Sequence, residues 1–176
     1  MKNILVTGGV GFIGTNLITE LVKLGHNVIS IDDYSAGLKT NEIESAKYVH
    51  LDIESINKID SDIDLCFHLA AKSRVQPSFK DPTEYFRVNV HGTMKVMEWA
   101  KKNNVKVIYA GSSSRHHNPS DSPYSMYKFL GEEVCKLYKK AYSVNVEIAR
   151  FYNVYGPYES LDEEHGNVIG IWRSKV

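Results

Sequence analysis

The alternation of short apolar runs with longer amphipathic stretches constrains the fold most. Several of the runs are β-branched and apolar at consecutive positions, as strands buried on both faces of a sheet require. The runs are residues 4–6, 28–31, 48–51, 63–69, 105–110 and 144–149. Strands that alternate with helices predict parallel pairing with right-handed crossovers. We therefore predict an α/β fold, a doubly wound parallel sheet of about six strands with helices on both faces.

Three stretches between these runs have helical spacing. The first, residues 12–24, is amphipathic, and we expect its apolar face to carry Ile13, Leu17 and Leu21. The second, residues 82–102, has Asp81 as its N-cap and a proline at its first position, and the third, residues 123–142, also opens on a proline. The connection after the second strand is brief, so we expect only a short helix at about residues 40–45.

Composition and charge exclude several classes of protein. The 176 residues suggest one domain with a substantial core, and 21 basic residues balance 21 acidic ones, so nothing indicates a nucleic-acid partner. Cys66 and Cys135 each lie in a predicted core element, which favours buried free thiols over a disulfide. The apolar run at the N-terminus is too short for a signal peptide or a membrane span. We expect a cytoplasmic protein without membrane partners.

A glycine-rich turn, VTGGVGFIG, joins the first strand to the first helix. It can be read as Gly9-x-Gly11-x-x-Gly14 or as Gly8-x-x-Gly11-x-x-Gly14. Glycines let the backbone turn tightly and approach a pyrophosphate, whose charge then meets the free N–H groups of the helix N-terminus. Because it lies between a strand and a helix, the motif predicts a dinucleotide site of the Rossmann type.

An acidic residue supports that site and indicates the cofactor. Asp32 ends the second strand, and Asp33 follows it. A carboxylate at this point accepts hydrogen bonds from the adenosine ribose and repels a 2′-phosphate. No arginine follows, and Lys39 is the only basic residue nearby. The sequence therefore favours NAD over NADP.

Tyr124 and Lys128 lie four residues apart and share one face of a predicted helix. Their position after the fifth strand places them beside the expected nicotinamide site. There an ammonium and the positive nicotinamide ring would both favour the tyrosine phenolate, a usable general base.

The serines and histidines of the segment GSSSRHHNPSDSPYSMYK, residues 111–128, could also indicate a serine hydrolase or a metal site. A serine hydrolase would usually show a G-x-S-x-G elbow, which the segment lacks. Adjacent histidines, here His116 and His117, project in different directions, and no acidic or cysteine ligands lie at supporting spacing, which argues against a metal. We expect these histidines in a loop at the mouth of the substrate cleft.

Several motifs together resemble the extended short-chain dehydrogenase/reductase family. They are TGGVGFIGTNL, HLAAKS, RVNVHGTMKVMEWAKK, YAGSSS, SPYSMYKFLGEE and ARFYNVYGP. Within that family they are most similar to NAD-dependent nucleotide-sugar epimerases and dehydratases of the UDP-glucose 4-epimerase type. The resemblance runs from residue 1 to about residue 157. It implies an NAD-binding domain over residues 1–157 and the start of a substrate domain over residues 158–176.

The resemblance also implies roles for individual residues. Ser112, Tyr124 and Lys128 are catalytic, with Ser113 as the runner-up for the serine and as a substrate contact beside Asn153. Cofactor contacts are implied for Gly8, Gly11, Phe12, Ile13, Gly14, Asp32, Asp33, Asp52, Ile53, Leu69, Ala70, Ala71, Lys72, Asn89, Tyr124, Lys128 and Phe151. No metal is implied.

The activity implied is epimerisation of a nucleotide sugar through a 4-keto intermediate. A 4,6-dehydratase is the first alternative, although such relatives carry a Thr-Asp-Glu triplet where this chain has Ser112-Ser113-Ser114. An NAD-binding module without turnover is the second. Relatives also pair the helices after strands four and five across a homodimer. Here Trp99, Met94 and Phe129 could serve in such a contact, although core packing explains them equally well.

Two departures from the family pattern bear on substrate choice. Only eleven residues separate Ser112 from Tyr124, fewer than in many relatives. Relatives also continue well beyond residue 176 with a smaller nucleotide-binding domain. Because Val168, Ile169, Ile171 and Trp172 form an apolar stretch with nothing in this chain to cover it, we expect a partner surface or the remainder of a longer protein.

Overall fold

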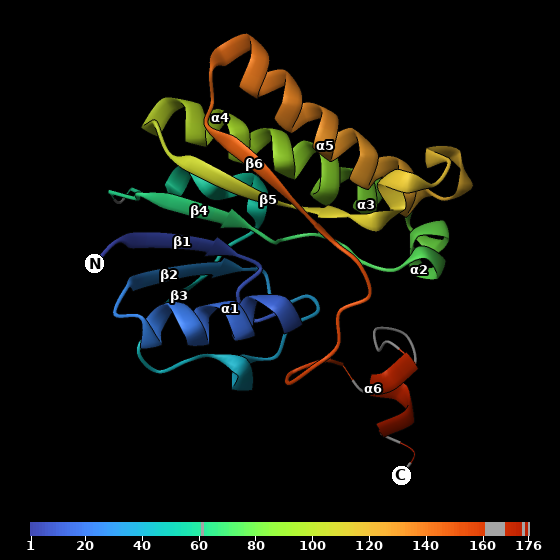
Figure 1. The fold of residues 1–176 in the computed structure, drawn as a ribbon, viewed down its shortest axis with the longest axis horizontal. Coiled ribbons are helices and arrows are strands. Elements are labelled where there is room, and N and C mark those ends of the chain that lie inside the picture. Colours follow the sequence, from blue (N-terminus) through green and yellow to red (C-terminus); the bar gives the residue numbers. More distant parts are fainter. Residues whose placement is uncertain (61, 161–167, 174, 176) are drawn as a thin grey trace.

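Six parallel strands form one sheet in the order β3-β2-β1-β4-β5-β6 (Figure 1). The computed structural model describes residues 1–60, 62–160, 168–173 and 175. The strands are β1 (Asn3–Thr7), β2 (Asn27–Asp32), β3 (Lys47–His50), β4 (Leu65–His68), β5 (Lys106–Ser112) and β6 (Val146–Phe151). Every neighbouring pair is parallel. The predicted doubly wound fold and all six predicted strand positions are confirmed.

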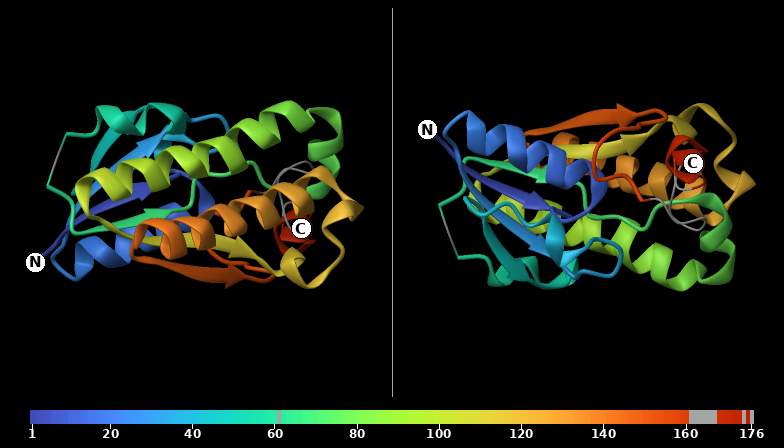
Figure 2. Two further views of the ribbon diagram at one scale, coloured as in Figure 1. Left: turned by 90° about the horizontal axis from the view of Figure 1, so that it is seen from above. Right: turned by 90° about the horizontal axis from the view of Figure 1, so that it is seen from below.

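Helices cover both faces of this sheet. The α-helices of the described residues are α1 (Phe12–Lys23), α2 (Val75–Lys80), α3 (Pro82–Phe86), α4 (Thr93–Asn103), α5 (Pro123–Tyr142) and α6 (Val168–Arg173), of which α6 lies apart from the sheet (Figure 1). Figure 2 shows α4 and α5 side by side over one face and α1 on the opposite face. The long helix predicted from residue 82 is continuous, but a π-helical segment, Arg87–Gly92, joins α3 to α4. As predicted, the Asp81 side chain caps it by accepting from the Glu84 N–H.

Alternation along the strands supplies a core on each face. In β1, Leu5 belongs to the core beneath α4 and α5, whereas Ile4 and Val6 belong to the core beneath α1. Both cysteines are buried free thiols in the core or beside it, as predicted. Trp99 is 4% exposed and packs in the core, so it is not available for the dimer face suggested above.

Two local predictions need correction. The buried face of α1 carries Gly14, Thr15, Ile18 and Leu21. Leu21 is thus confirmed, Leu17 packs against the same core only partly buried, and Ile13 does not belong to that core. A Cβ on Gly14 would lie 2.2 Å from the Gly8 carbonyl oxygen, so the bare glycine lets the helix start tightly against the turn and thereby sets its rotation. The connection after β2 holds only a 3₁₀ turn, Lys39–Asn41, because residues 42–46 run on extended or in turns toward β3.

The strand order positions the site. The chain passes from β1 outward to β2 and β3, then returns to β4 on the other side of β1. The loops after β1, β2 and β4 therefore diverge at the carboxyl ends of the strands, which is where doubly wound sheets bind ligands. No helix among the described residues is long and apolar enough to cross a membrane. Of the apolar C-terminal stretch, Ile169 and Trp172 are exposed, and the side chain of Val168 lies outside the described residues.

Candidate active site

A cavity of about 1210 Å³ follows the carboxyl ends of the strands. Loops after β1, β2, β4, β5 and β6 all contribute to its wall. The predicted residues that line it are Gly8, Gly11, Phe12, Ile13, Gly14, Asp32, Asp33, Ile53, Leu69, Ala70, Ala71, Lys72, Ser112, Ser113, Tyr124, Lys128, Phe151 and Asn153. The structure thus gathers nearly every predicted site residue around one space, and Asp52 and Asn89 are the two that stand behind its wall.

Of the four glycines in the turn after β1, Gly8, Gly11 and Gly14 line this cavity and Gly9 does not, which selects the second of the two glycine patterns. Gly8 has φ +74°, and a Cβ there would lie 2.8 Å from the Ala70 nitrogen, so the turn requires glycine. A Cβ on Gly9 would instead lie 2.0 Å from the Ser30 hydroxyl oxygen. Gly9 is therefore a packing residue between the turn and β2.

Gly11 differs from its neighbours because the space around it is open. A Cβ there would approach only the Gly8 carbonyl oxygen, at an ordinary 3.4 Å. Gly11 is also the N-cap of α1, and no side chain caps that helix end. An anion can thus approach the first N–H groups of α1 without meeting a side chain, so this turn fits the diphosphate of a dinucleotide.

Two backbone N–H groups hold the Asp32 carboxylate in place at the end of β2. Its Oδ2 accepts from the Val10 N–H at 3.1 Å and its Oδ1 from the Tyr34 N–H at 2.8 Å. Burial raises the pKa of this carboxyl above its ordinary value, while the two N–H donors act in the opposite direction. A carboxylate fixed in this way can accept hydrogen bonds from ribose hydroxyls.

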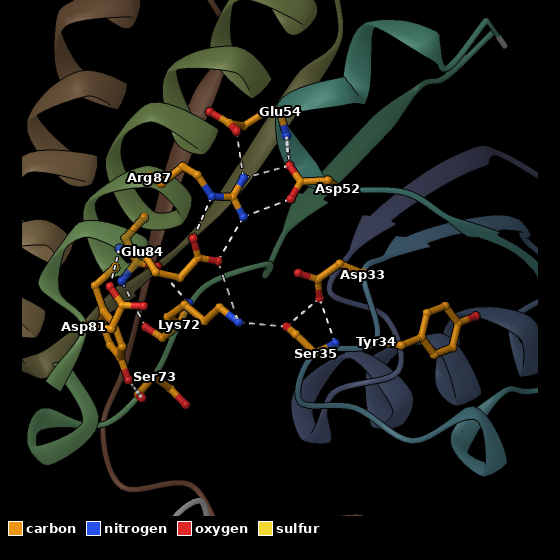
Figure 3. A network of polar contacts seen from close by, with 12 residues as sticks. Asp33, Tyr34, Ser35, Asp52, Glu54, Lys72, Ser73, Asp81, Glu84 and Arg87 are labelled. Carbon is orange, nitrogen blue, oxygen red and sulfur yellow. Dashed lines mark hydrogen bonds and ion pairs between the residues drawn. The ribbon is translucent and has the colours of Figure 1, made fainter.

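An ion-pair network centred on Arg87 lies behind the part of the cavity wall that follows β3 (Figure 3). Its guanidinium pairs with Glu84 at 2.7 Å, Glu54 at 2.7 Å and Asp52 at 2.9 Å. Hydrogen bonding to Arg87 lowers the pKa of Asp52 and of Glu54. Asp52 and Glu54 are thereby turned toward Arg87, and Ile53, between them in the sequence, is buried at the cavity wall.

Asn89 does not line the cavity but supports its wall by binding the backbone of Lys72. It is 1% exposed, and its amide accepts from the Lys72 N–H at 2.8 Å and donates to the Lys72 carbonyl at 2.9 Å. The loop after β4 is thus clamped to the π-helical segment. The Lys72 side chain then reaches toward the loop after β2 and donates to the Ser35 hydroxyl at 2.9 Å (Figure 3).

Ser112, Tyr124 and Lys128 meet at the other end of the cavity. Ser122 caps α5 by accepting from the Ser125 N–H, which places Tyr124 in the first turn. The Tyr124 hydroxyl lies 3.4 Å from the Ser112 hydroxyl. Lys128 is buried one turn on and donates to the Ala110 carbonyl at 2.7 Å. Burial lowers the pKa of Lys128 from 10.5 to about 8.

The remaining polar residues of this loop separate by position. Ser113 lines the cavity, but Ser112 is the serine whose hydroxyl faces Tyr124. His117 lines the cavity, whereas the ring of His116 stacks on Tyr152 with centroids 6.1 Å apart. Among the described residues, no group of three or more His, Cys, Asp or Glu could hold a metal ion.

Sequence reasoning missed several residues of the wall. They include Val10, Ser35, Asn41, Leu51, Ser73, Arg74, Val88, Ser122, Ser125, Tyr152 and Tyr158. Most lie in loops whose course no periodicity predicts. The position of Ser35 three residues beyond Asp32 was the one usable signal, because loops that follow neighbouring parallel strands share an edge of the sheet.

A family model and a curated relative each match nearly the whole chain. The model of the NAD dependent epimerase/dehydratase family matches residues 4–176. The UDP-N-acetyl-alpha-D-glucosaminuronate decarboxylase of Bacillus cytotoxicus is 32% identical, over 96% of this chain and 59% of its own length.

Two solved structures superpose closely. The UDP-glucose 4-epimerase of Thermotoga maritima, in a crystal structure with UDP-glucose, has a TM-score of 0.91 at 27% identity, over 98% of this chain and 62% of that one. DesIV, a dTDP-glucose 4,6-dehydratase of Streptomyces venezuelae with NAD bound, has a TM-score of 0.89 at 26% identity, over 98% and 61%. The chain thus spans about three fifths of the length of these relatives, and the predicted cofactor, NAD, is confirmed.

Proposed function

Since the chain belongs to the NAD dependent epimerase/dehydratase family, we propose that it acts as a nucleotide-sugar epimerase of the UDP-sugar 4-epimerase type. The observation that carries the proposal is the approach of the Tyr124 and Ser112 hydroxyls, 3.4 Å apart, in the cavity that also contains the glycine turn and Asp32. Two hydroxyls at that spacing can both form hydrogen bonds with the same oxygen of a sugar.

The proposed chemistry divides between the cofactor and the chain. Bound NAD would accept a hydride from the sugar carbon and return it. Tyr124 removes the proton of the sugar hydroxyl as that oxygen becomes a carbonyl, and gives it back in the return step. Ser112 donates a hydrogen bond to the same oxygen while charge develops on it. Return of that hydride to the opposite face would invert the centre.

Lys128 is the proposed catalytic partner of Tyr124. Its side chain is buried one helical turn beyond the tyrosine and lines the same cavity. Phe151, Ser113 and Asn153 line the same cavity. We propose that Phe151 lies against the nicotinamide and that Ser113 and Asn153 contact the sugar.

A 4,6-dehydratase is the alternative with structural support, because DesIV superposes on 98% of this chain. Elimination of water needs an acid and a base beside the reacting carbons. The two positions after Ser112 carry hydroxyls, Ser113 and Ser114, which are poor at either task. This favours epimerisation. A decarboxylase, also represented among relatives, needs a carboxylated sugar.

The test is incubation with NAD and a panel of UDP-, GDP- and dTDP-sugars, followed by NMR of the products. A sugar inverted at one carbon supports the epimerase, and a 4-keto-6-deoxy sugar would replace it with the dehydratase. Binding of NAD with no product from any sugar would leave an NAD-binding module and end the proposal of turnover by this chain.

We also propose a cytoplasmic homodimer paired through α4 and α5. Met94 on α4 and Leu137 on α5 are exposed apolar side chains on these adjacent helices, which supports the pairing. Sedimentation equilibrium would show a mass of two chains, and a monomer at all concentrations would contradict it.

A further inference from the structure

A third residue continues the helix face that carries Tyr124 and Lys128. Glu132 lies one turn beyond Lys128 on α5, and residues four apart on a helix share a face. Its side chain is 1% exposed. A buried carboxylate is costly unless charged partners and hydrogen bonds compensate it, so its partners indicate why it lies there.

Cations from three elements surround Glu132. Arg150 of β6 donates to it through Nε at 3.0 Å and Nη2 at 2.7 Å. Lys136 approaches from the next turn of α5 at 3.0 Å, and Arg115 from the loop after β5 at 3.4 Å. Hydrogen bonding to Arg150 is the main cause that lowers the pKa of Glu132 to about 2. The carboxylate is therefore ionised throughout the neutral range.

Arg115 carries this tie into the candidate active site. It belongs to the 3₁₀ turn Ser113–His116, which Ser112 caps by accepting from the Ser114 N–H. Besides Glu132, the guanidinium of Arg115 pairs with Glu133 at 3.1 Å and lies 4.2 Å from the centroid of the Phe129 ring. The turn after Ser112 is thus fastened to α5, the helix that carries Tyr124.

A glycine at the end of β5 accommodates the same cluster. A Cβ on Gly111 would lie 3.0 Å from Ile148, 3.2 Å from the Arg150 side chain and 3.5 Å from a carboxylate oxygen of Glu132. The strand end that precedes Ser112 therefore runs directly against Glu132 and Arg150. Ser112 is bounded on both sides in the chain by contacts to this one carboxylate and its partners.

We infer that Glu132 is a positioning residue, which holds the segment Gly111–His116 against α5 through Arg115 and Arg150 and so sets the distance between the Ser112 and Tyr124 hydroxyls. The catalytic consequence rests on the proposed function. The contact between the two hydroxyls joins two separate elements, and a shift of about 1 Å in such a geometry can cost a hundredfold in rate. Glu132 itself touches no substrate in this arrangement.

Three variants test the inference in the 176-residue chain with NAD. Arg115→Met removes the loop tie and keeps an apolar stem over Phe129, and since Arg115 is partly exposed, we expect the variant to fold. Glu132→Gln removes the central charge. Glu147→Gln is the matched control, because Glu147 lies on β6 like Arg150 but its side chain is 58% exposed and pairs with Lys139, and exposed pairs contribute little.

For Arg115→Met and Glu132→Gln we expect kcat to fall about tenfold or more, with the KM for the nucleotide sugar and the Kd for NAD within about twofold of wild type. Amide hydrogen exchange at residues 113–117 should accelerate about tenfold. Glu147→Gln should remain near wild type in all four measurements.

The outcomes separate this inference from the proposed function. Unchanged exchange in Arg115→Met overturns the inference, as does faster exchange with an unchanged kcat, or an effect of Glu147→Gln as large as that of Arg115→Met. If wild type converts no nucleotide sugar, the proposed function fails, and the exchange rates still decide whether Glu132 and Arg115 hold the segment. If Glu132→Gln does not fold, Arg115→Met alone decides.

Discussion

The Tyr124 hydroxyl lies 3.4 Å from the Ser112 hydroxyl, although eleven residues lie between them in the sequence. Ser112 ends a strand and Tyr124 lies in the first turn of the helix that follows. The two 3₁₀ turns between them, Ser113–His116 and Pro119–Asp121, fold the short connection back over the sheet edge. This closeness makes the pair the centre of the proposed chemistry.

Removing the Tyr124 hydroxyl should abolish turnover and leave the cofactor bound. We expect Tyr124→Phe to lower kcat by about 10²–10⁴, the range for loss of a general base, with the Kd for NAD nearly unchanged. Product NMR and NAD titration measure the two. Tyr127→Phe is the control, because its ring packs against Phe86 with centroids 5.5 Å apart. Intact activity in Tyr124→Phe would refute the assignment of the base.

The glycine turn allows stability and cofactor affinity to be separated. Gly14→Ala forces a Cβ to 2.2 Å from the Gly8 carbonyl oxygen, so we expect it to lose about 1–3 kcal/mol of unfolding free energy. Gly11→Ala meets only an ordinary contact and should keep wild-type stability, while its methyl group lowers NAD affinity about tenfold, or about 1.4 kcal/mol. Denaturant unfolding without NAD and titration with NAD measure the two effects. Full NAD affinity in Gly11→Ala would argue against diphosphate binding at this turn.

Asp32 should decide between the two nicotinamide cofactors. Wild type should bind NAD more tightly than NADP, because a carboxylate repels the 2′-phosphate. Asp32→Ser should narrow that preference about tenfold or more, mainly through weaker NAD binding and stronger NADP binding. Asp64→Asn is a suitable control, because Asp64 accepts from the Asn3 N–H at the opposite end of the sheet. A wild-type preference for NADP would overturn the role of Asp32.

The buried ammonium of Lys128 should cost stability. Its pKa falls from 10.5 to about 8 through burial, which corresponds to about 3 kcal/mol at neutral pH. Lys128→Met should therefore raise the unfolding free energy at pH 7 by about 2 kcal/mol, since the loss of the bond to Ala110 offsets part of the gain.

The sign of the pH dependence follows from the same shift. Below pH 8 the ammonium is charged in both the folded and unfolded wild-type chain, so the burial cost is present in full. Between pH 8 and 10.5 the folded chain releases its proton first, so wild-type stability should rise relative to Lys128→Met. Urea unfolding from pH 7 to 10.5 measures the difference. A constant difference over this range would contradict a buried ammonium.

Much of the fold could be predicted because its signals are local. Apolar runs without alternation predict strands covered on both faces, and proline after a capping residue predicts where α3 and α5 begin. The rotation of α1 could not be predicted in this way. It depends on the contact between Gly14 and Gly8, which periodicity does not contain.

Part of the candidate site could likewise be predicted from the sequence and part could not. The glycine turn, Asp32 and the pair Tyr124 and Lys128 were predicted, because each lies where a strand ends or a helix begins. Asp52 and Asn89 were expected to contact the cofactor, yet their side chains are bound to Arg87 and to the Lys72 backbone. Both remain candidates for an indirect role.

By itself, the sequence determined which elements form, in what order, and which residues stand at the carboxyl ends of the strands, because these follow from local pattern and connection rules. Tertiary structure alone decided which glycines of the turn line the cavity and that Glu132 binds both Arg115 and Arg150. Such choices depend on distances of a few ångströms between residues remote in the chain, and packing determines these distances only when all elements are in place.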